Sequence, residues 1–181
     1  MIGTMNKKEC VLKTESGFTL IEMLIVIIIL GILAMVIIPQ ITVSTEDAKL
    51  STLQANLTGI RNSVETYYVQ HGNVYPGVKK TDGTVSASDA DSATAFAAQL
   101  TQYTAFSGAV QNTKDGTYKY GPYMKGGKLP GNPYDDGASD VTCDYDEGNI
   151  TVRTADATSA WKFYPKTGVF IANDSSANAA Y

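Results

Sequence analysis

Hydrophobic residues form one long run near the start of the chain and recur in shorter patterns after it. From Phe18 to Ile38 only Thr19 and Glu22 are polar. At about 1.5 Å per residue this run makes a helix of about 31 Å, which matches the roughly 30 Å hydrocarbon core of a bilayer. An excess of lysine before the run favours a cytoplasmic N-terminus, with the rest of the chain outside. We therefore predict a transmembrane helix over residues 18–38.

After Pro39 the pattern changes to an apolar stripe with a helical period, and polar residues fill the other positions. We predict that the same helix continues as an amphipathic half over residues 39–72, where Gly72 ends it. The lone His71 is expected at the surface. The stripe is expected to dock on the protein's own head domain, and a coiled-coil partner is the alternative. Its members recur at spacings of three and four: Leu50, Leu53, Leu57, Ile60, Val64 and Tyr67.

Residues 73–181 have the composition of a small globular head domain with helix and strand. The polar, turn-rich stretch 73–90 reads as a loop. A short helix is predicted from Asp91 to about Tyr103, with Asp91 or Ser92 as its N-cap.

Four runs of strand-forming residues follow, separated by turn signals, and the last two are joined by a hairpin signal. They predict a small antiparallel sheet packed on the long helix, so the expected fold class is α+β. Alternation along the third run places Trp161 and Phe163 on one face, where they are expected to pack in the core. The runs are residues 117–124, 149–155, 160–165 and 169–173.

Glu22 requires an explanation, because an ionised carboxylate is costly in a bilayer and rarely lacks a function there. A cleaved secretory signal fits poorly, since the apolar run is too long and no small-residue cleavage pattern follows it. A plain membrane anchor explains the length, with Glu22 reaching to the headgroups. A helix that is first held in the membrane and later packed against copies of itself also explains Glu22, as a pairing group.

The residues around Glu22 form a specific motif. The sequence SGFTLIE, residues 16–22, follows a short charged leader and begins the apolar helix, with Gly31 inside the run and Pro39 at its end. This pattern resembles the N-terminus of type IV pilins and of the related pseudopilins of type II secretion systems. The close match covers about residues 13–40. A long helix followed by a small α/β head is similar to the family more loosely.

The resemblance implies processing and assembly. In that family a membrane aspartic protease cuts after the glycine, and the new amino group is methylated. Here this implies loss of the leader, residues 1–17, by cleavage between Gly17 and Phe18, with N-methylated Phe18 as the mature N-terminus. The implied partners are the prepilin peptidase and N-methyltransferase, an inner-membrane assembly platform, and copies of the same chain in a helical filament.

The amino group of Phe18, which cleavage would create, is the expected partner of Glu22 on a neighbouring subunit. Opposite charges at ~4 Å attract by about 4 kcal/mol at an effective dielectric of about 20. Desolvation consumes most of this, so the pair is expected to set register more than stability. Gly31 and Pro39 weaken the helix between them, and we expect a kink at Pro39 and a locally melted segment 31–39 in the filament.

The predicted function is therefore structural, as a subunit of a type IV pilus-like filament that serves adhesion or motility. The alternative is a major pseudopilin of a type II secretion system. A rival of another class is a membrane-anchored module whose head binds a ligand or DNA. The expected location is the inner membrane before assembly, with the head outside, and then an extracellular pilus or a periplasmic pseudopilus.

The net charge and the small number of histidines and cysteines argue against nucleic-acid binding and against catalysis. A net charge of -4 and a pI near 4.9 argue against a nucleic-acid partner. The chain has one histidine, and loss of the leader removes Cys10 and leaves Cys143 as its one cysteine. This leaves little material for a nucleophile–base pair or a zinc site, so we expect neither an enzyme nor a resident cofactor.

Calcium is the one metal for which the sequence offers candidate ligands. The acidic segment 129–149 reads as a loop, and calcium prefers several hard oxygen ligands. Related major pseudopilins have calcium in a C-terminal loop, although the spacing here is not that of an EF-hand. The candidate ligands are Asp135, Asp136, Asp140, Asp144, Asp146 and Glu147.

Overall fold

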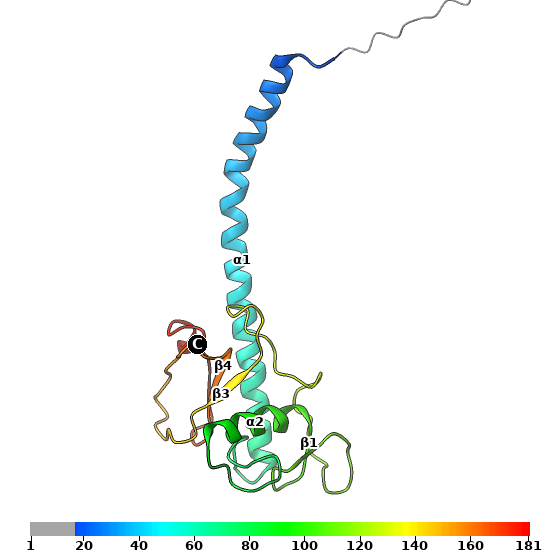
Figure 1. Cartoon of the computed structure of the whole chain (residues 1–181), viewed down its shortest axis with the longest axis vertical. Coiled ribbons are helices and arrows are strands. Elements are labelled where there is room, and N and C mark those ends of the chain that lie inside the picture. Colours follow the sequence, from blue (N-terminus) through cyan, green and yellow to red (C-terminus); the bar gives the residue numbers. More distant parts are fainter. Residues whose placement is uncertain (1–16) are drawn as a thin grey trace, which may run out of the picture. The chain divides into compact units, whose positions relative to one another are not determined.

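The computed structural model describes residues 17–181, and of residues 36–44 it describes the backbone alone. The chain divides into two compact units, residues 1–44 and residues 45–181. Helix α1 (Leu20–Gln70) begins in the first unit and ends in the second, which also holds the remaining labelled elements (Figure 1). These are α2 (Asp89–Thr101), β1 (Tyr103–Thr104), β2 (Val110–Gln111), β3 (Val141–Cys143), β4 (Trp161–Tyr164), β5 (Val169–Ala172) and the short 3-10 helix η1 (Asn178–Ala180).

The predicted transmembrane segment, leader and kink all involve residues of which the structure describes only the backbone or nothing. Where side chains are described, over residues 17–35 and 45–181, no helix is long and apolar enough to cross a membrane. The predicted transmembrane segment 18–38 extends beyond residue 35 and stays a prediction. The leader residues 1–16, and the side chain of Pro39 with its predicted kink, lie outside the described residues.

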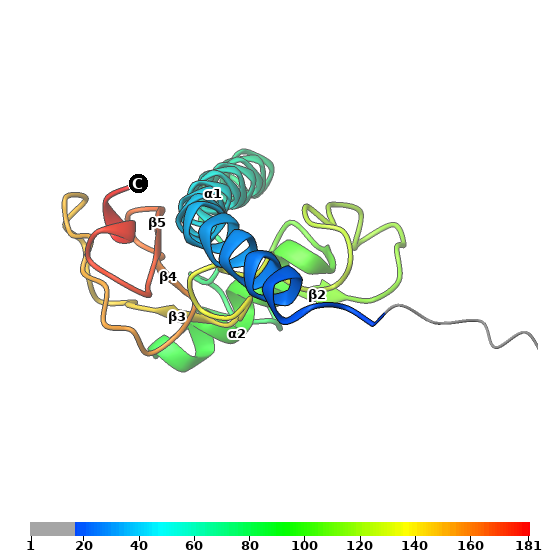
Figure 2. The ribbon, with the colours of Figure 1, turned by 90° about the horizontal axis from the view of Figure 1, so that it is seen from above.

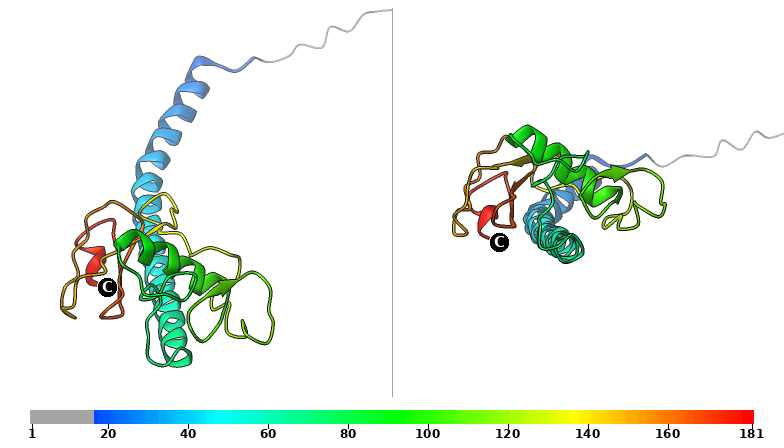
Figure 3. Two further views of the ribbon diagram at one scale, coloured as in Figure 1. Left: turned by 60° about the horizontal axis from the view of Figure 1, so that its bottom comes forward. Right: turned by 90° about the horizontal axis from the view of Figure 1, so that it is seen from below.

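The predicted apolar stripe of α1 is confirmed in the second unit. Its side chains from Leu53 to Tyr67 are almost completely buried against the head, in one cluster with α2 and the sheet. Figure 3 shows α2 beside this part of α1 from two sides. The helix ends at Gln70, and Gly72 follows with φ of +69°, where the ring of Phe106 leaves little room for a side chain. Only glycine adopts this conformation without cost, which explains the stop.

The sheet of the head has three strands in the order β3-β4-β5 (Figure 2). β4 and β5 form the predicted antiparallel hairpin, with Phe163 opposite Phe170. Trp161 and Phe163 share the core face as predicted, while Tyr164 packs in a second cluster on the other face. This alternation is the period-two pattern of a strand.

The expected α+β class is confirmed, but the sheet differs from the predicted antiparallel one in one pair, because β3 pairs in parallel with β4. β3 lies in the acidic segment 129–149, whose many turn-forming residues conceal the short run Val141–Cys143. The long connection from residue 144 to residue 160 lets the chain return to the same end of the sheet, which a parallel pair requires.

Two of the four predicted strand runs form no strand. Run 117–124 contributes a single bridge between Tyr120 and Thr104, beside the short β1–β2 pair. In run 149–155, side chains bind the backbone groups that a strand would use. The Asn149 side chain accepts from Thr151 N, and the Tyr164 hydroxyl lies 3.2 Å from both N and O of Thr154.

Helix α2 begins two residues before the predicted start. Its N-cap is Ser88, whose hydroxyl accepts a hydrogen bond of 3.2 Å from Asp91 N. The two acids in the first turn, Asp89 and Asp91, also favour this start because the helix dipole is positive there. Phe96 and Leu100 of this helix are buried in the core.

The expectation of a surface position for His71 is wrong. Its side chain is 3% exposed. Nδ1 lies 2.9 Å from Tyr67 O and Nε2 lies 3.0 Å from the Thr104 hydroxyl, so both ring nitrogens have partners. The ring also stacks on Tyr67, with centroids 3.7 Å apart. A histidine is apolar enough to be buried when its two nitrogens are satisfied, which composition alone does not reveal.

Candidate assembly site

The predicted processing point lies just before α1, in residues that belong to no helix or strand. Gly17 and Phe18 precede the helix, and both are exposed, Phe18 by 80%. A Cβ added to Gly17 would meet nothing within 4 Å, so its own surroundings do not require glycine. A residue without a Cβ leaves room for another backbone to approach this peptide closely.

Glu22 and Thr19 form a capping box at the start of α1. Thr19 N donates to Glu22 Oε2 at 2.7 Å, and Glu22 N donates to the Thr19 hydroxyl at 3.3 Å. The hydroxyl of Thr19 donates to the same carboxylate oxygen at 2.8 Å. Two of the helix's unpaired backbone N–H groups are satisfied in this way. The spacing T-x-x-E signals such a cap in the sequence, and our sequence analysis did not use it.

The capping box fixes where the Glu22 carboxylate lies. Oε2 is used by Thr19, and a carboxylate accepts about four hydrogen bonds in total. The residue before Thr19 is Phe18, whose nitrogen would become the amine of a processed chain. The carboxylate is thus held within one turn of the predicted N-terminus, with acceptor capacity left for a further donor.

The apolar side chains of the first unit are exposed wherever they are described. Their exposed fractions lie between 45% and 92%. A monomeric soluble protein rarely exposes so large a contiguous apolar surface. Gly31 lies within this surface, and a Cβ there would meet nothing inside 4 Å. The exposed residues are Phe18, Leu20, Ile21, Met23, Leu24, Ile25, Val26, Ile27, Ile28, Ile29, Leu30, Ile32, Leu33 and Met35.

The calcium candidates are not gathered into one site. Among the described residues no three acids, histidines or cysteines are placed to hold a metal ion. Asp140 Oδ1 accepts from Ala160 N, and Asp144 Oδ1 accepts from Glu147 N. Asp146 forms an exposed ion pair of 3.5 Å with Lys166. Asp135 and Asp136 lie in the turn that follows Asn132. Calcium binding stays a prediction.

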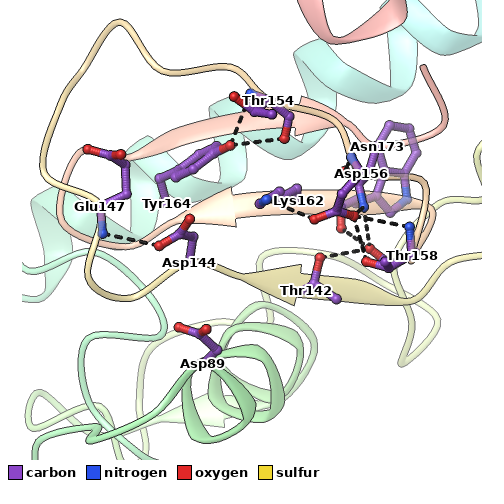
Figure 4. A network of polar contacts seen from close by, with 12 residues as sticks. Asp89, Thr142, Asp144, Glu147, Thr154, Asp156, Thr158, Lys162, Tyr164 and Asn173 are labelled. Carbon is purple, nitrogen blue, oxygen red and sulfur yellow. Dashed lines mark hydrogen bonds and ion pairs between the residues drawn. The ribbon is translucent and has the colours of Figure 1, made fainter. Parts of the chain in front are cut away.

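A different set of polar side chains forms a network at one end of the sheet (Figure 4). The carboxylate of Asp156 accepts hydrogen bonds from Lys162 Nζ at 2.9 Å, from Asn173 Nδ2 at 2.7 Å and from Thr158. The hydrogen bond from the Thr158 hydroxyl, with that from Lys162, lowers the pKa of Asp156 well below its usual range. This network ties β4 and the residue after β5 to the preceding loop, and it serves the fold.

Comparison with known proteins agrees with the geometry of the N-terminus. Residues 12–38 match the prokaryotic N-terminal methylation motif. Curated relatives of the chain include type IV pilins and a type II secretion protein, so the chain is similar to these proteins. No solved structure matches the chain.

The relatives include fimbrial and type IV pilin proteins as well as a type II secretion system protein. Type II secretion system core protein G of Pseudomonas aeruginosa is 32% identical over 68 residues, which cover 38% of this chain and 47% of that protein. The fimbrial protein of Neisseria meningitidis serogroup B is 39% identical over 75 residues, 41% of this chain and 44% of the relative. The type IV major pilin PilE of Neisseria gonorrhoeae is 39% identical over 74 residues, again 41% and 44%. The matches thus span less than half the length of these relatives.

Proposed function

We propose that this chain is a prepilin whose mature form is a structural subunit of a type IV pilus-like filament. Prepilin peptidase removes residues 1–17, and copies then assemble through helix α1, which begins two residues after Phe18. The single observation that carries the proposal is the exposed apolar surface from Phe18 to Met35, which starts at an accessible Gly17–Phe18 peptide. That surface needs lipid or sister helices around it.

The apolar surface by itself does not choose between these two surroundings. Full burial of one large aliphatic side chain from water is worth about 1.5–3 kcal/mol. Lipid tails are as apolar as neighbouring helices, so little of this is gained when the helix leaves the membrane. The step into a filament therefore relies on close packing and on polar groups that pair only between subunits.

Glu22 is the polar group in the right place for such a pair. Its carboxylate stays bonded to Thr19 of its own chain and accepts the Phe18 amine of a neighbour with its remaining capacity. The two interactions are compatible, so assembly does not require the cap to break. An unpaired buried charge costs about 3–5 kcal/mol, which penalises every register in which the pair is missed.

The test is Glu22→Ala in the full-length chain, with Glu46→Ala as the matched control on the same helix. Glu46 is an exposed acid with a 3.8 Å contact to Lys49, which contributes little. We expect the Glu22 variant to be processed but to yield at least about tenfold less sheared filament, given the size of that charge penalty. Normal filament from the Glu22 variant would contradict the assembly role.

A second candidate is a subunit of a type II secretion pseudopilus. The similarity to core protein G of Pseudomonas aeruginosa supports it. Cys143 is free and buried, so the described head lacks the disulfide-closed C-terminal loop of many classical pilins. Deletion of the encoding gene distinguishes the two, because loss of surface fibres points to a pilus and loss of protein export points to a pseudopilus.

A further inference from the structure

The two arginines of the chain line the same pocket, although 91 residues separate them in the sequence. Arg61 lies on α1, and Arg153 lies in the connection between β3 and β4. The pocket has a volume of about 320 Å³ and is bounded by α1 on one side and by β5 and the last residue, Tyr181, on the other. Figure 2 shows this side of the head, where β5 and the C-terminus lie next to α1.

Hydrogen bonds to main-chain oxygens fix the guanidinium group of Arg61. Its Nε and Nη2 donate to Phe170 O at 3.1 and 2.8 Å, and Nη1 donates to Tyr181 O at 2.8 Å. These bonds satisfy the outer edge of β5 and leave some of the five guanidinium protons for another acceptor. Partial burial lowers the pKa of Arg61, and the positive charge of Arg153 lowers it further.

One carboxylate, that of Glu65, also lines the pocket, but no ion pair joins it, or any other aspartate or glutamate, to either arginine among the described residues. Arg153 is exposed, and the apolar side chain of Ile150 beside it is 66% exposed. Two cations that repel each other next to an exposed apolar group are an unfavourable arrangement in an isolated domain, and an incoming acidic group with an apolar neighbour would relieve it.

We infer that this pocket binds an acidic side chain from a second copy of the chain, with Arg61 and Arg153 as the two donors. The inference rests on the proposed filament, which brings copies into contact. Charge complementarity supports a second copy as the occupant, because acidic residues outnumber basic ones by fifteen to eleven in residues 45–181. The planar fork of arginine suits a carboxylate, which it binds through two parallel hydrogen bonds.

The direct test is a zero-length crosslink. Arg153→Lys keeps the charge and introduces a primary amine, which a carbodiimide couples only to a carboxylate in contact with it. Filaments are grown from an equal mixture of ¹⁴N- and ¹⁵N-labelled copies, crosslinked and digested, and the peptides are read by mass spectrometry. We expect an amide between position 153 and an aspartate or glutamate of mixed isotopic origin. A link to Glu65 of the same copy alone, or no link at position 153, overturns the inference.

A charge reversal gives an independent readout. Arg153→Glu is compared with Lys114→Glu, an exposed cation with no ion pair among the described residues and with the same change in charge. We expect about tenfold less filament from the Arg153 variant than from the Lys114 variant, at equal processing and equal unfolding temperature. Equal filament yields overturn the pocket's role while the proposed function stands. Absence of filament from the unmodified chain instead rejects the proposed function itself.

Discussion

The carboxylate of Glu22 accepts a 2.7 Å hydrogen bond from the backbone N–H of Thr19, three residues earlier. This pair gives Glu22 a role inside its own chain that is separable from any role between chains. A carboxamide at position 22 can still accept from Thr19 N, because glutamine also serves in a capping box. It cannot attract an amine by charge.

The first prediction uses this separation. Glu22→Gln should preserve the start of α1 and abolish assembly, whereas Thr19→Ala should weaken the start by about 1 kcal/mol and leave assembly largely intact. The measurements are helix content by circular dichroism in detergent and the yield of sheared filament. If the Thr19 variant loses filaments as completely as the Glu22 variant, the cap and not the charge governs assembly.

The second prediction concerns the hairpin between β4 and β5. Gly168 has φ of +74°, and a Cβ there would overlap the ring of Tyr75. Gly168→Ala should lower the free energy of unfolding by about 1–3 kcal/mol, since both the backbone and the contact are strained. Gly116→Ala is the matched control, because its φ is not positive and a Cβ would meet nothing within 4 Å. Equal urea midpoints for the two variants would argue against this hairpin geometry.

The third prediction follows from the buried His71. Burial lowers the pKa of its imidazole, while hydrogen bonds to the main chain oppose the shift. The unfolded chain therefore binds a proton more readily than the folded chain. The stability that depends on neutral His71 is fully present above the ordinary histidine pKa of about 6.5 and is lost as the pH falls below it.

His71→Gln removes this titration, so urea midpoints at pH 7.5 and pH 5.5 should differ more for the unmodified protein than for the variant. Carboxylates with lowered pKa values, such as Asp156, titrate below this window and do not obscure the effect. An equal difference for both proteins would show that His71 is not buried in its neutral form.

The fourth prediction compares two ion pairs of the head. Asp156→Ala leaves Lys162 and Asn173 without their shared acceptor, and the side chain of Lys162 is only 11% exposed. We expect a loss of about 1–3 kcal/mol in the free energy of unfolding, the cost of leaving such groups unsatisfied. Asp146→Ala is the control, since that side chain is 97% exposed and its ion pair is worth at most about 1 kcal/mol. A larger effect at Asp146 would contradict the assignment of the Asp156 network to the fold.

The sequence predicted the buried faces correctly where hydrophobic residues recur with the period of a helix or of a strand. The stripe from Leu53 to Tyr67 and the alternation of Trp161 and Phe163 both predicted the buried faces, because burial imposes those periods directly. The processing motif was also readable, since it is a local arrangement of a few residue types.

The sequence was uninformative where an element depends on distant partners. β3 has three residues and exists because it pairs with β4, twenty residues later. Runs 117–124 and 149–155 have strand-forming composition, but in the described structure the first pairs only at Tyr120 and the second contains no strand residue. His71 and the arginine pocket likewise depend on contacts between segments far apart in the chain, which no local pattern records.

The most direct measurement of the central claim is mass spectrometry of the intact protein recovered from sheared surface or periplasmic material. The account predicts filaments built from a polypeptide that starts at Phe18 and carries one added methyl group. Recovery of the chain only from the membrane, as single copies that retain their first seventeen residues, would contradict it.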